Sequence, residues 1–166
     1  MKSNKFALLS AGRLALVLWI LTALVAGWLF VFGQTSAGGA GQRTTIRLQP
    51  AERELVLQEM RGLLAGTQGI IDGISREDWL RVTQSAQMAG MAAAADVNPA
   101  LMAKLPLSFK SLGMSVHGDM DAIARAAASG ETQSQLLTRL SGTLSKCVAC
   151  HSSWQLGAPA DTGMTK

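Results

Sequence analysis

The chain has 166 residues, of which 48% are hydrophobic and 16% are charged, and its formal net charge is +4. A high apolar content with so few charges excludes a disordered chain, and two cysteines are too few for a disulfide-dense secreted scaffold. The length allows one domain of ordinary size, or one small domain with an appendage.

The first predicted element is a membrane-spanning helix over residues 14–32. Seventeen of these 19 residues are apolar, and as a helix they would be about 28 Å long, close to the thickness of a bilayer's hydrocarbon core. Three cations precede them within residues 1–13, and no acid occurs before Glu52. The positive-inside rule therefore places residues 1–13 in the cytoplasm and the rest of the chain in a bacterial periplasm.

A cleaved signal peptide is the alternative. Its apolar region would be about 7–15 residues long and closely followed by a small-x-small site, which Ala37, Gly39 and Ala40 could supply. The length of the run favours a retained anchor. Without its first 32 residues the chain carries 12 basic and 11 acidic residues. The basic character is therefore mainly a topology signal, and we expect no nucleic-acid partner.

Beyond the apolar run, the pattern becomes that of a linker followed by helices. Residues 33–49 predict a flexible linker, because they combine four glycines with Ser, Thr and Gln. From Pro50 onward apolar residues recur at i, i+3 and i+4, and no segment alternates with period two for long enough to be a strand. This spacing predicts helices over about residues 50–73, 75–96, 108–128 and 131–154. We therefore expect an all-α fold, in which a transmembrane helix precedes an antiparallel four-helix bundle over residues 50–156 and a frayed tail over residues 157–166.

Two local patterns refine the first helices of the bundle. Ser75 and Asp78 resemble a capping box, which predicts that the second helix begins at Ser75. Four glycines share one face of the first helix: Gly62, Gly66, Gly69 and Gly73. Each interior glycine costs about 1 kcal/mol relative to alanine. Something should compensate this cost: the glycine face is either a close-packing seam, which could accommodate a second subunit, or a merely exposed face, and the sequence favours neither.

The chemistry of the chain is concentrated near its C-terminus, in the sequence Cys147-Val148-Ala149-Cys150-His151. CxxCH is the attachment signature of c-type haem. In a helix, Cys147 and Cys150 lie one turn apart on nearly one face, so both thiols can reach the vinyl groups of one porphyrin. His151 shares this face and can bind the iron. We therefore expect one covalent haem c.

Two other uses of a CxxC pair compete with haem. A zinc site needs four ligands, and His117 is the only plausible third ligand. A thioredoxin-like redox pair needs a βαβ context, which the sequence lacks. Because both cysteines of an exported chain lie in the motif, haem is the favoured interpretation.

The position of the motif points to a family. Only 15 residues follow His151, so a sixth iron ligand must come from upstream. Four predicted helices with CxxCH near the end of the last one resemble the cytochrome c′ family, the class II c-type cytochromes, over about residues 50–155. The resemblance implies that the open side of the haem faces the first helix, where some members place a methionine and others an apolar residue. It also implies a possible homodimer. The membrane anchor departs from the soluble members of the family.

Met60 is the residue of this chain that falls at that position. On a helical wheel with 100° per residue, a group of mostly apolar residues lies within about 60° of Met60: Val56, Leu57, Leu63, Leu64, Thr67 and Ile71. A thioether is a good sixth ligand for haem iron and raises its potential. Met60 is therefore the expected distal ligand, and a core methionine that fills a gap is the alternative.

Three further features lie around this predicted site. His117 is the rival ligand, but the apolar face of its helix is centred about 100° away, so we expect it at the bundle edge, paired with Asp121. Arg53 lies two turns before Met60 and is a candidate partner for a haem propionate; a solvated arginine is the alternative. The alanine-rich residues 89–95 would leave room for a porphyrin, or simply reflect helix propensity.

Two functions follow from these residues. With His151 and Met60 as axial ligands the iron is saturated. This favours one-electron transfer by a cytochrome anchored in the bacterial inner membrane, with redox proteins of a respiratory or oxidative chain as partners. If Met60 is not a ligand, the iron is five-coordinate with an apolar distal face, which favours binding of NO or CO. No catalytic constellation is evident, so we do not expect an enzyme.

Overall fold

The computed structural model describes residues 4–36, 43–95 and 98–157. Within them the chain is mostly helical. The elements are α1 (Asn4–Phe32), β1 (Thr35–Ser36), β2 (Thr44–Arg47), α2 (Pro50–Ser75), α3 (Trp79–Met88), α4 (Pro99–Lys104), α5 (Leu107–Ala128), α6 (Gln133–Ser153) and β3 (Trp154–Gly157). Parts of the predicted N-terminus, linker and tail, together with the small residues of the possible cleavage site, lie outside the described residues.

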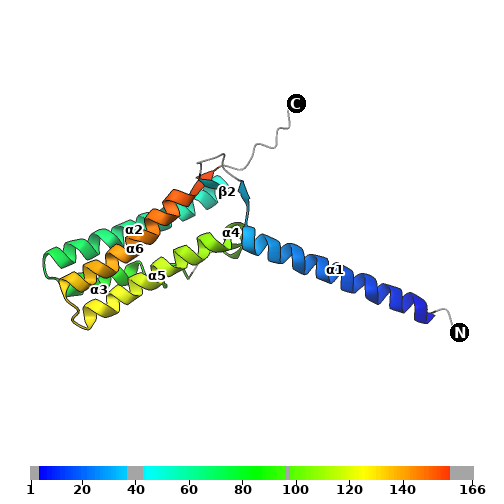
Figure 1. Cartoon of the computed structure of the whole chain (residues 1–166), viewed down its shortest axis with the longest axis horizontal. Coiled ribbons are helices and arrows are strands. Elements are labelled where there is room, and N and C mark those ends of the chain that lie inside the picture. Colours follow the sequence, from blue (N-terminus) through cyan, green and yellow to red (C-terminus); the bar gives the residue numbers. More distant parts are fainter. Residues whose placement is uncertain (1–3, 37–42, 96–97, 158–166) are drawn as a thin grey trace, which may run out of the picture.

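α1 is an apolar helix that stands apart from the others. Its stretch Gly12–Phe32 is long and apolar enough to cross a membrane, and a signal sequence near an N-terminus passes the same test. All side chains of residues 12–32 are exposed. In Figure 1 the helix projects away from the remaining helices, which it leaves at the end where α4 and β2 lie.

Four helices share one hydrophobic core. α2 packs along α3, α3 along α5, and α5 along α6, as Figure 1 shows. All four helices contribute buried side chains, among them Leu63, Ile70, Ile74, Val82, Ala86, Val116, Met120, Ile123, Leu136 and Leu140. At the end remote from α1, Gln133 Nε2 donates a hydrogen bond to Ile74 O at 2.9 Å. This bond ties the start of α6 to the end of α2.

The glycine face of α2 packs against α3 of the same chain, so the interpretation of a seam for a second subunit is corrected for three of the four glycines. Added Cβ atoms would lie 2.7–2.8 Å from carbon atoms of the neighbouring segment: Gly66 from Ala89, Gly69 from Ser85, and Gly73 from Val82. Carbon atoms do not approach so closely, so only glycine allows this contact. Gly62 meets nothing within 4 Å. The close α2–α3 contact supplies the compensation that the interior glycines require.

The buried face of α2 overlaps with the predicted one, since Val56, Leu63 and Thr67 are buried, but it is rotated towards the glycines. Leu64 and Ile71, expected inside, are 69% and 47% exposed, whereas the glycine face is buried. α6 shows a similar difference, because three of its predicted inward residues are exposed: Leu137, Leu144 and Val148. In α2 the reason is the α2–α3 contact, which turns the glycine side inward and leaves Leu64 and Ile71 exposed.

α3 begins later than predicted. Its N-cap is Asp78, whose Oδ1 accepts a hydrogen bond from Arg81 N at 2.9 Å. Ser75 instead closes α2, where its hydroxyl donates to Asp72 O at 2.8 Å. The capping box predicted at Ser75 is therefore wrong, since the preceding helix continues through that residue.

α3 also ends earlier than predicted, at Met88, and residues 89–95 are not helical. Asp121 of α5 accepts a hydrogen bond from Met91 N at 3.2 Å. A Cβ on Gly90 would collide with the same carboxylate. This tertiary contact takes a backbone donor that a continuing helix would use, and the chain turns over α5 instead.

The segment predicted as a flexible linker forms strands in its described parts. β1 pairs antiparallel with β2, and β2 pairs parallel with β3. Ile46 and Leu48 are 0% and 1% exposed, while Arg47 between them is exposed, so this segment does alternate with period two. Gly157, expected in the tail, belongs to β3. The mostly helical fold therefore includes a small sheet, and the prediction of a flexible linker is wrong for the described part of this segment. An alternation over so few residues is too short to indicate a strand in the sequence.

A second hydrophobic cluster lies against this sheet. Its buried members are Ile46, Leu48, Val56, Leu101 and Leu105. Met60, Phe109, Trp154 and other partly buried residues pack against it. The cluster joins the sheet to α4 and to the first turns of α2, so the start of α2 and the end of α6 are brought together at one end of the molecule.

Candidate functional site

The CxxCH motif lies in the C-terminal turns of α6. This helix begins with a capping box, in which Thr132 N donates to Gln135 Oε1 at 2.8 Å, and continues to Ser153. Cys147 and Cys150 are half-buried, and His151 is exposed. Because the motif is helical, its three reactive side chains lie within little more than one turn of each other.

A cavity of about 310 Å³ lies beside the motif. Met60 lines it from α2, and Cys150 and His151 line it from α6. The other lining residues are Arg43, Arg53, Val56, Leu57, Phe109, Trp154, Gln155 and Leu156. Three of the four predicted site residues are therefore brought together, although α2 and α6 are far apart in the sequence.

Cys147 is the fourth predicted site residue, and it does not line the cavity. It is half-buried and packs against the main core, one helical turn before Cys150. The two thiols consequently have different surroundings, one at the cavity and the other against the main core.

Aromatic side chains form part of the cavity wall. Trp154, the first residue of β3, packs edge-on against Phe109 of α5, with ring centroids 6.1 Å apart. The parallel pairing of Trp154 with Thr44 fixes this segment beside the chain that precedes α2. The small sheet therefore positions the residues that follow the motif.

Two guanidinium groups give the cavity a positive charge. Arg53 comes from the first turns of α2, and Arg43 immediately precedes β2. Arg43 Nη1 donates to His151 O at 3.4 Å, so it contacts the motif directly. None of the described residues that line the cavity is acidic. The electrostatics favour an anionic group in this place.

The environment of the thiols disfavours a reactive cysteine pair. Burial raises the pKa of both Cys147 and Cys150, and the neighbouring Cys147 raises that of Cys150 further. A redox-active CxxC pair instead needs a lowered thiol pKa. Among residues 4–36, 43–95 and 98–157, no three His, Cys, Asp or Glu side chains are grouped to hold a metal ion. The zinc interpretation therefore has no ligand set in these ranges.

His117 lies inside the molecule, which corrects the prediction of an edge position. It is 4% exposed, with Nδ1 2.8 Å from Ala89 O and Nε2 3.4 Å from Glu59 Oε1. Its predicted partner, Asp121, accepts from Met91 N instead. Because α3 ends early, the following chain covers the polar face of α5. With both ring nitrogens facing protein groups, His117 has a structural role.

Sequence reasoning missed five residues of the cavity: Arg43, Phe109, Trp154, Gln155 and Leu156. The alternation of residues 44–48 and the short distance of Trp154 from the motif were usable signals. Nothing in the sequence indicates that Arg43 contacts His151, because that contact depends on the pairing of two segments separated by more than 100 residues.

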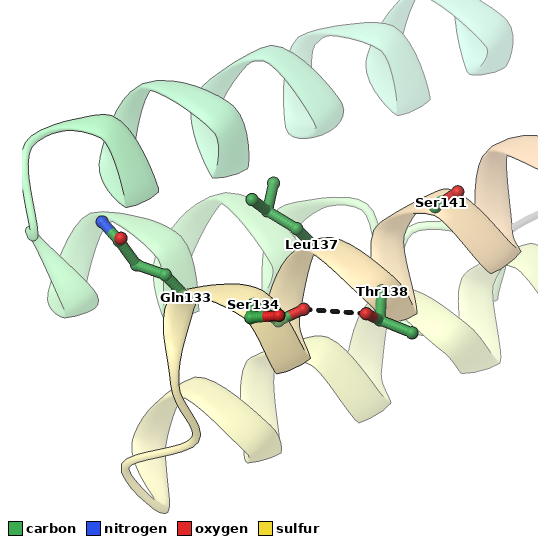
Figure 2. A pocket seen from close by; sticks show the side chains of 5 residues that line it. All are labelled: Gln133, Ser134, Leu137, Thr138 and Ser141. Carbon is green, nitrogen blue, oxygen red and sulfur yellow. Dashed lines mark hydrogen bonds between the residues drawn. The ribbon is translucent and has the colours of Figure 1, made fainter.

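Another hollow, of about 520 Å³, lies on the surface of α6 and offers no comparable chemistry. Its lining residues are Gln133, Ser134, Leu137, Thr138 and Ser141. Figure 2 shows that all five come from this one helix, with Thr138 Oγ1 donating to Ser134 O at 2.8 Å. None of the five is titratable. The cavity beside the CxxCH motif is therefore the candidate site.

The chain matches no protein-family model, no curated protein and no solved structure. The resemblance to the cytochrome c′ family therefore depends on the position of the motif and on the helices around it. Any assignment of function has to be argued from the cavity.

Proposed function

We propose that this protein is a membrane-anchored c-type cytochrome that transfers single electrons, with one haem attached through Cys147 and Cys150 and with His151 and Met60 as axial ligands. One observation carries the proposal: Met60 of α2 and Cys150 and His151 of α6 line the same cavity. CxxCH is the attachment signature of c-type haem, and a thioether across the cavity from an imidazole is the donor pair of a six-coordinate haem.

The lining of the cavity fits this group. Val56, Leu57 and Phe109 provide an apolar surface for a flat ring. Arg43 and Arg53 suit two propionates, because a guanidinium can pair with a carboxylate through two parallel hydrogen bonds. The cysteines, one helical turn apart, would supply the two thioether bonds. In this proposal α2, α3, α5 and α6 form a four-helix bundle of the cytochrome c′ type.

Each residue then has a defined role. Haem would supply a one-electron change at its iron. His151 and Met60 belong to helices of one core, so both donors would keep their positions when the charge of the site changes, and electron transfer would need little rearrangement. A Met60 thioether on the iron would favour the reduced state and raise the potential. Trp154 and Phe109 pack together and keep water from that side of the cavity.

α1 supplies the anchor in this proposal. Its stretch Gly12–Phe32 suits a single membrane crossing by length and composition. The cations before it favour a cytoplasmic N-terminus and a periplasmic haem domain at the bacterial inner membrane. The partners would be redox proteins of a respiratory or oxidative chain.

A second function, binding of NO or CO, is favoured by the packing of Met60. This side chain contacts both hydrophobic clusters, as a methionine that fills a gap in a core does. If Met60 keeps that packing in the haem-bound protein, the iron is five-coordinate and its distal side is open to a small gas.

The absorption spectrum of the ferric full-length protein in detergent separates the two functions. We expect a low-spin spectrum with the weak red band of methionine–iron ligation, and loss of that band in Met60→Ala. Met88→Ala is the control, because Met88 is 72% exposed on α3 and its removal leaves the spectrum unchanged. A high-spin wild-type spectrum that shifts on addition of CO or NO would overturn electron transfer in favour of gas binding.

A further inference from the structure

A buried lysine holds the end of α1 against the rest of the protein. Lys110 of α5 is 7% exposed, and its ammonium donates to Phe30 O and to Met102 O, each at 3.1 Å. The same ammonium lies 4.1 Å from the centroid of the Phe30 ring. A buried ammonium is costly unless it is paired. Two of these three contacts come from α1, whose carbonyl end carries the negative pole of the helix dipole.

The residue that follows α1 is fitted just as closely. Gly33 is buried and has φ +62, a conformation that favours glycine. A Cβ there would lie 2.6 Å from Pro106 N and still closer to Lys104 O. Gln34 N then donates to Lys104 O at 2.7 Å. The two residues that directly follow α1, Gly33 and Gln34, are therefore both in contact with the end of α4.

The same segment continues into the sheet beside the cavity. Thr35 pairs with Ile46 in the β1–β2 ladder, and Arg47 N donates to Gln34 O at 2.9 Å. β2 in turn pairs with β3, which begins three residues after His151. Two strand spacings amount to about 10 Å. The end of the apolar helix and the CxxCH motif therefore lie at one end of the molecule.

We infer that α1 is a retained part of the folded domain, and that its docking through Lys110, Gly33 and β1 holds the cavity beside the membrane surface in one orientation. Cleavage after Ala40 would remove Phe30, Gly33 and β1. It would leave the buried ammonium with Met102 O alone among the contacts described. The inference rests on the membrane anchor of the proposed function and does not depend on whether haem is bound.

The first experiment is the intact mass of the protein extracted from membranes of the producing cell. We expect a mass that includes residues 12–32. A mature N-terminus located after residue 36 would overturn retention, whatever the haem spectrum of the protein.

The second experiment measures docking by hydrogen exchange of the full chain in nanodiscs. Lys110→Met is expected to accelerate exchange of residues 33–36 about tenfold, because the ammonium no longer holds Phe30 O. Lys146→Met is the control, since Lys146 pairs with Asp119 away from α1. Gly33→Ala should accelerate the same residues even if Lys110→Met folds poorly. Unchanged exchange at residues 33–36 in both variants would overturn docking.

The third experiment measures orientation. A nitroxide is placed through an encoded amino acid at exposed Ser152, near the cavity, or at exposed Leu80. Leu80 follows the far end of α2, whose 26 residues span about 39 Å. Lipids that carry gadolinium at their headgroups should relax the Ser152 label several-fold more than the Leu80 label, each compared with gadolinium-free lipids. Equal relaxation would overturn the fixed orientation.

Discussion

The two sides of α2 are packed in opposite ways. Towards α3, Gly66, Gly69 and Gly73 bring the helices so close that a single added carbon does not fit. On the opposite side Leu64 is exposed, and half-buried Met60 lines the cavity together with residues of α6. The first side is completed by the chain itself. The second side borders the cavity that the proposed function assigns to haem.

The two histidines follow the same division. His117 contacts Ala89 O and Glu59 on the closed side and is buried. His151 is exposed and lines the cavity on the open side. A histidine whose two ring nitrogens already face protein groups has no nitrogen available to bind iron. A histidine at a cavity wall can offer a ring nitrogen to iron. Surroundings, rather than residue type, distinguish a candidate ligand from a structural residue.

The largest expected effect tests the open side. Replacing both motif cysteines, Cys147→Ser with Cys150→Ser, should abolish covalent haem staining of the protein on a denaturing gel, because no thiol remains to form a thioether. Ala149→Ser, between the two cysteines, is the control and should retain the stain. Staining that persists in the double variant would contradict covalent attachment of haem through these cysteines. The cavity side of α2 would then no longer be distinguished from the glycine side as a haem site.

The next effect tests the closed side. His117→Ala should lower the free energy of unfolding by about 2–3 kcal/mol, because Ala89 O loses its buried partner and a small cavity remains. Urea unfolding of the full chain in detergent measures this change, and the ferric absorption spectrum should stay as in the wild type. A shift of that spectrum in His117→Ala would return His117 to the set of iron ligands.

A pair of glycine variants tests the close contact directly. Gly69→Ala should destabilise the protein by about 1–3 kcal/mol, because the new Cβ collides with Ser85. Gly62→Ala has open space and should stabilise the protein by up to about 1 kcal/mol through helix propensity. Thermal unfolding compares the two. A changed oligomeric state in Gly69→Ala without loss of stability would restore the interpretation of a subunit seam.

The smallest effect concerns the first turn of α2, beside the cavity. Glu52 accepts a hydrogen bond from Lys104 Nζ at 2.5 Å and another from Gln49 N at 2.9 Å. These bonds hold the pKa of Glu52 below its ordinary value of 4.5. Because the folded pKa is lowered, their contribution is complete above pH 4.5 and is lost as pH falls through the folded value.

Glu52→Gln should therefore cost about 1 kcal/mol or less at pH 7, and its deficit against the wild type should shrink below pH 4.5. Thermal unfolding between pH 7 and pH 3 measures this. Glu54→Gln is the control, because Glu54 and its partner Arg61 are both exposed. A deficit for Glu52→Gln that is independent of pH would show that the ion pair does not hold α2.

Much of the helical architecture could be predicted from the sequence. The start of α2 at Pro50, the end of α5 at Ala128 and the apolar helix before residue 33 all follow from local composition and punctuation. The face that α2 buries could be predicted from apolar periodicity only in part: Val56, Leu63 and Thr67 are buried as expected, but the burial of the glycine side was not expected. That face is set by how closely glycine lets α3 approach, and Leu64 and Ile71 are exposed as a consequence.

The candidate site, too, could be predicted from the sequence only in part. A local motif identifies Cys150 and His151, and the helical wheel together with the family resemblance identifies Met60. That these three line one cavity depends on the sheet and on the second hydrophobic cluster, which join distant segments. Arg43 lines the cavity because it directly precedes β2. This strand of four residues is too short to leave a reliable pattern in the sequence.

The parallel pairing of β2 with β3 has a consequence for the order of folding. β2 precedes the first helix of the domain and β3 follows the last one, so the ladder from Thr44–Trp154 to Arg47–Gly157 joins residues 110 positions apart. Contacts of such long sequence separation form late, and a chain synthesised from its N-terminus delivers β3 last. The wall of the cavity is therefore completed only after α6 has emerged. Between the emergence of α6 and the pairing of β3 with β2, the CxxCH motif would be accessible to the enzymes that attach a haem in the proposed function.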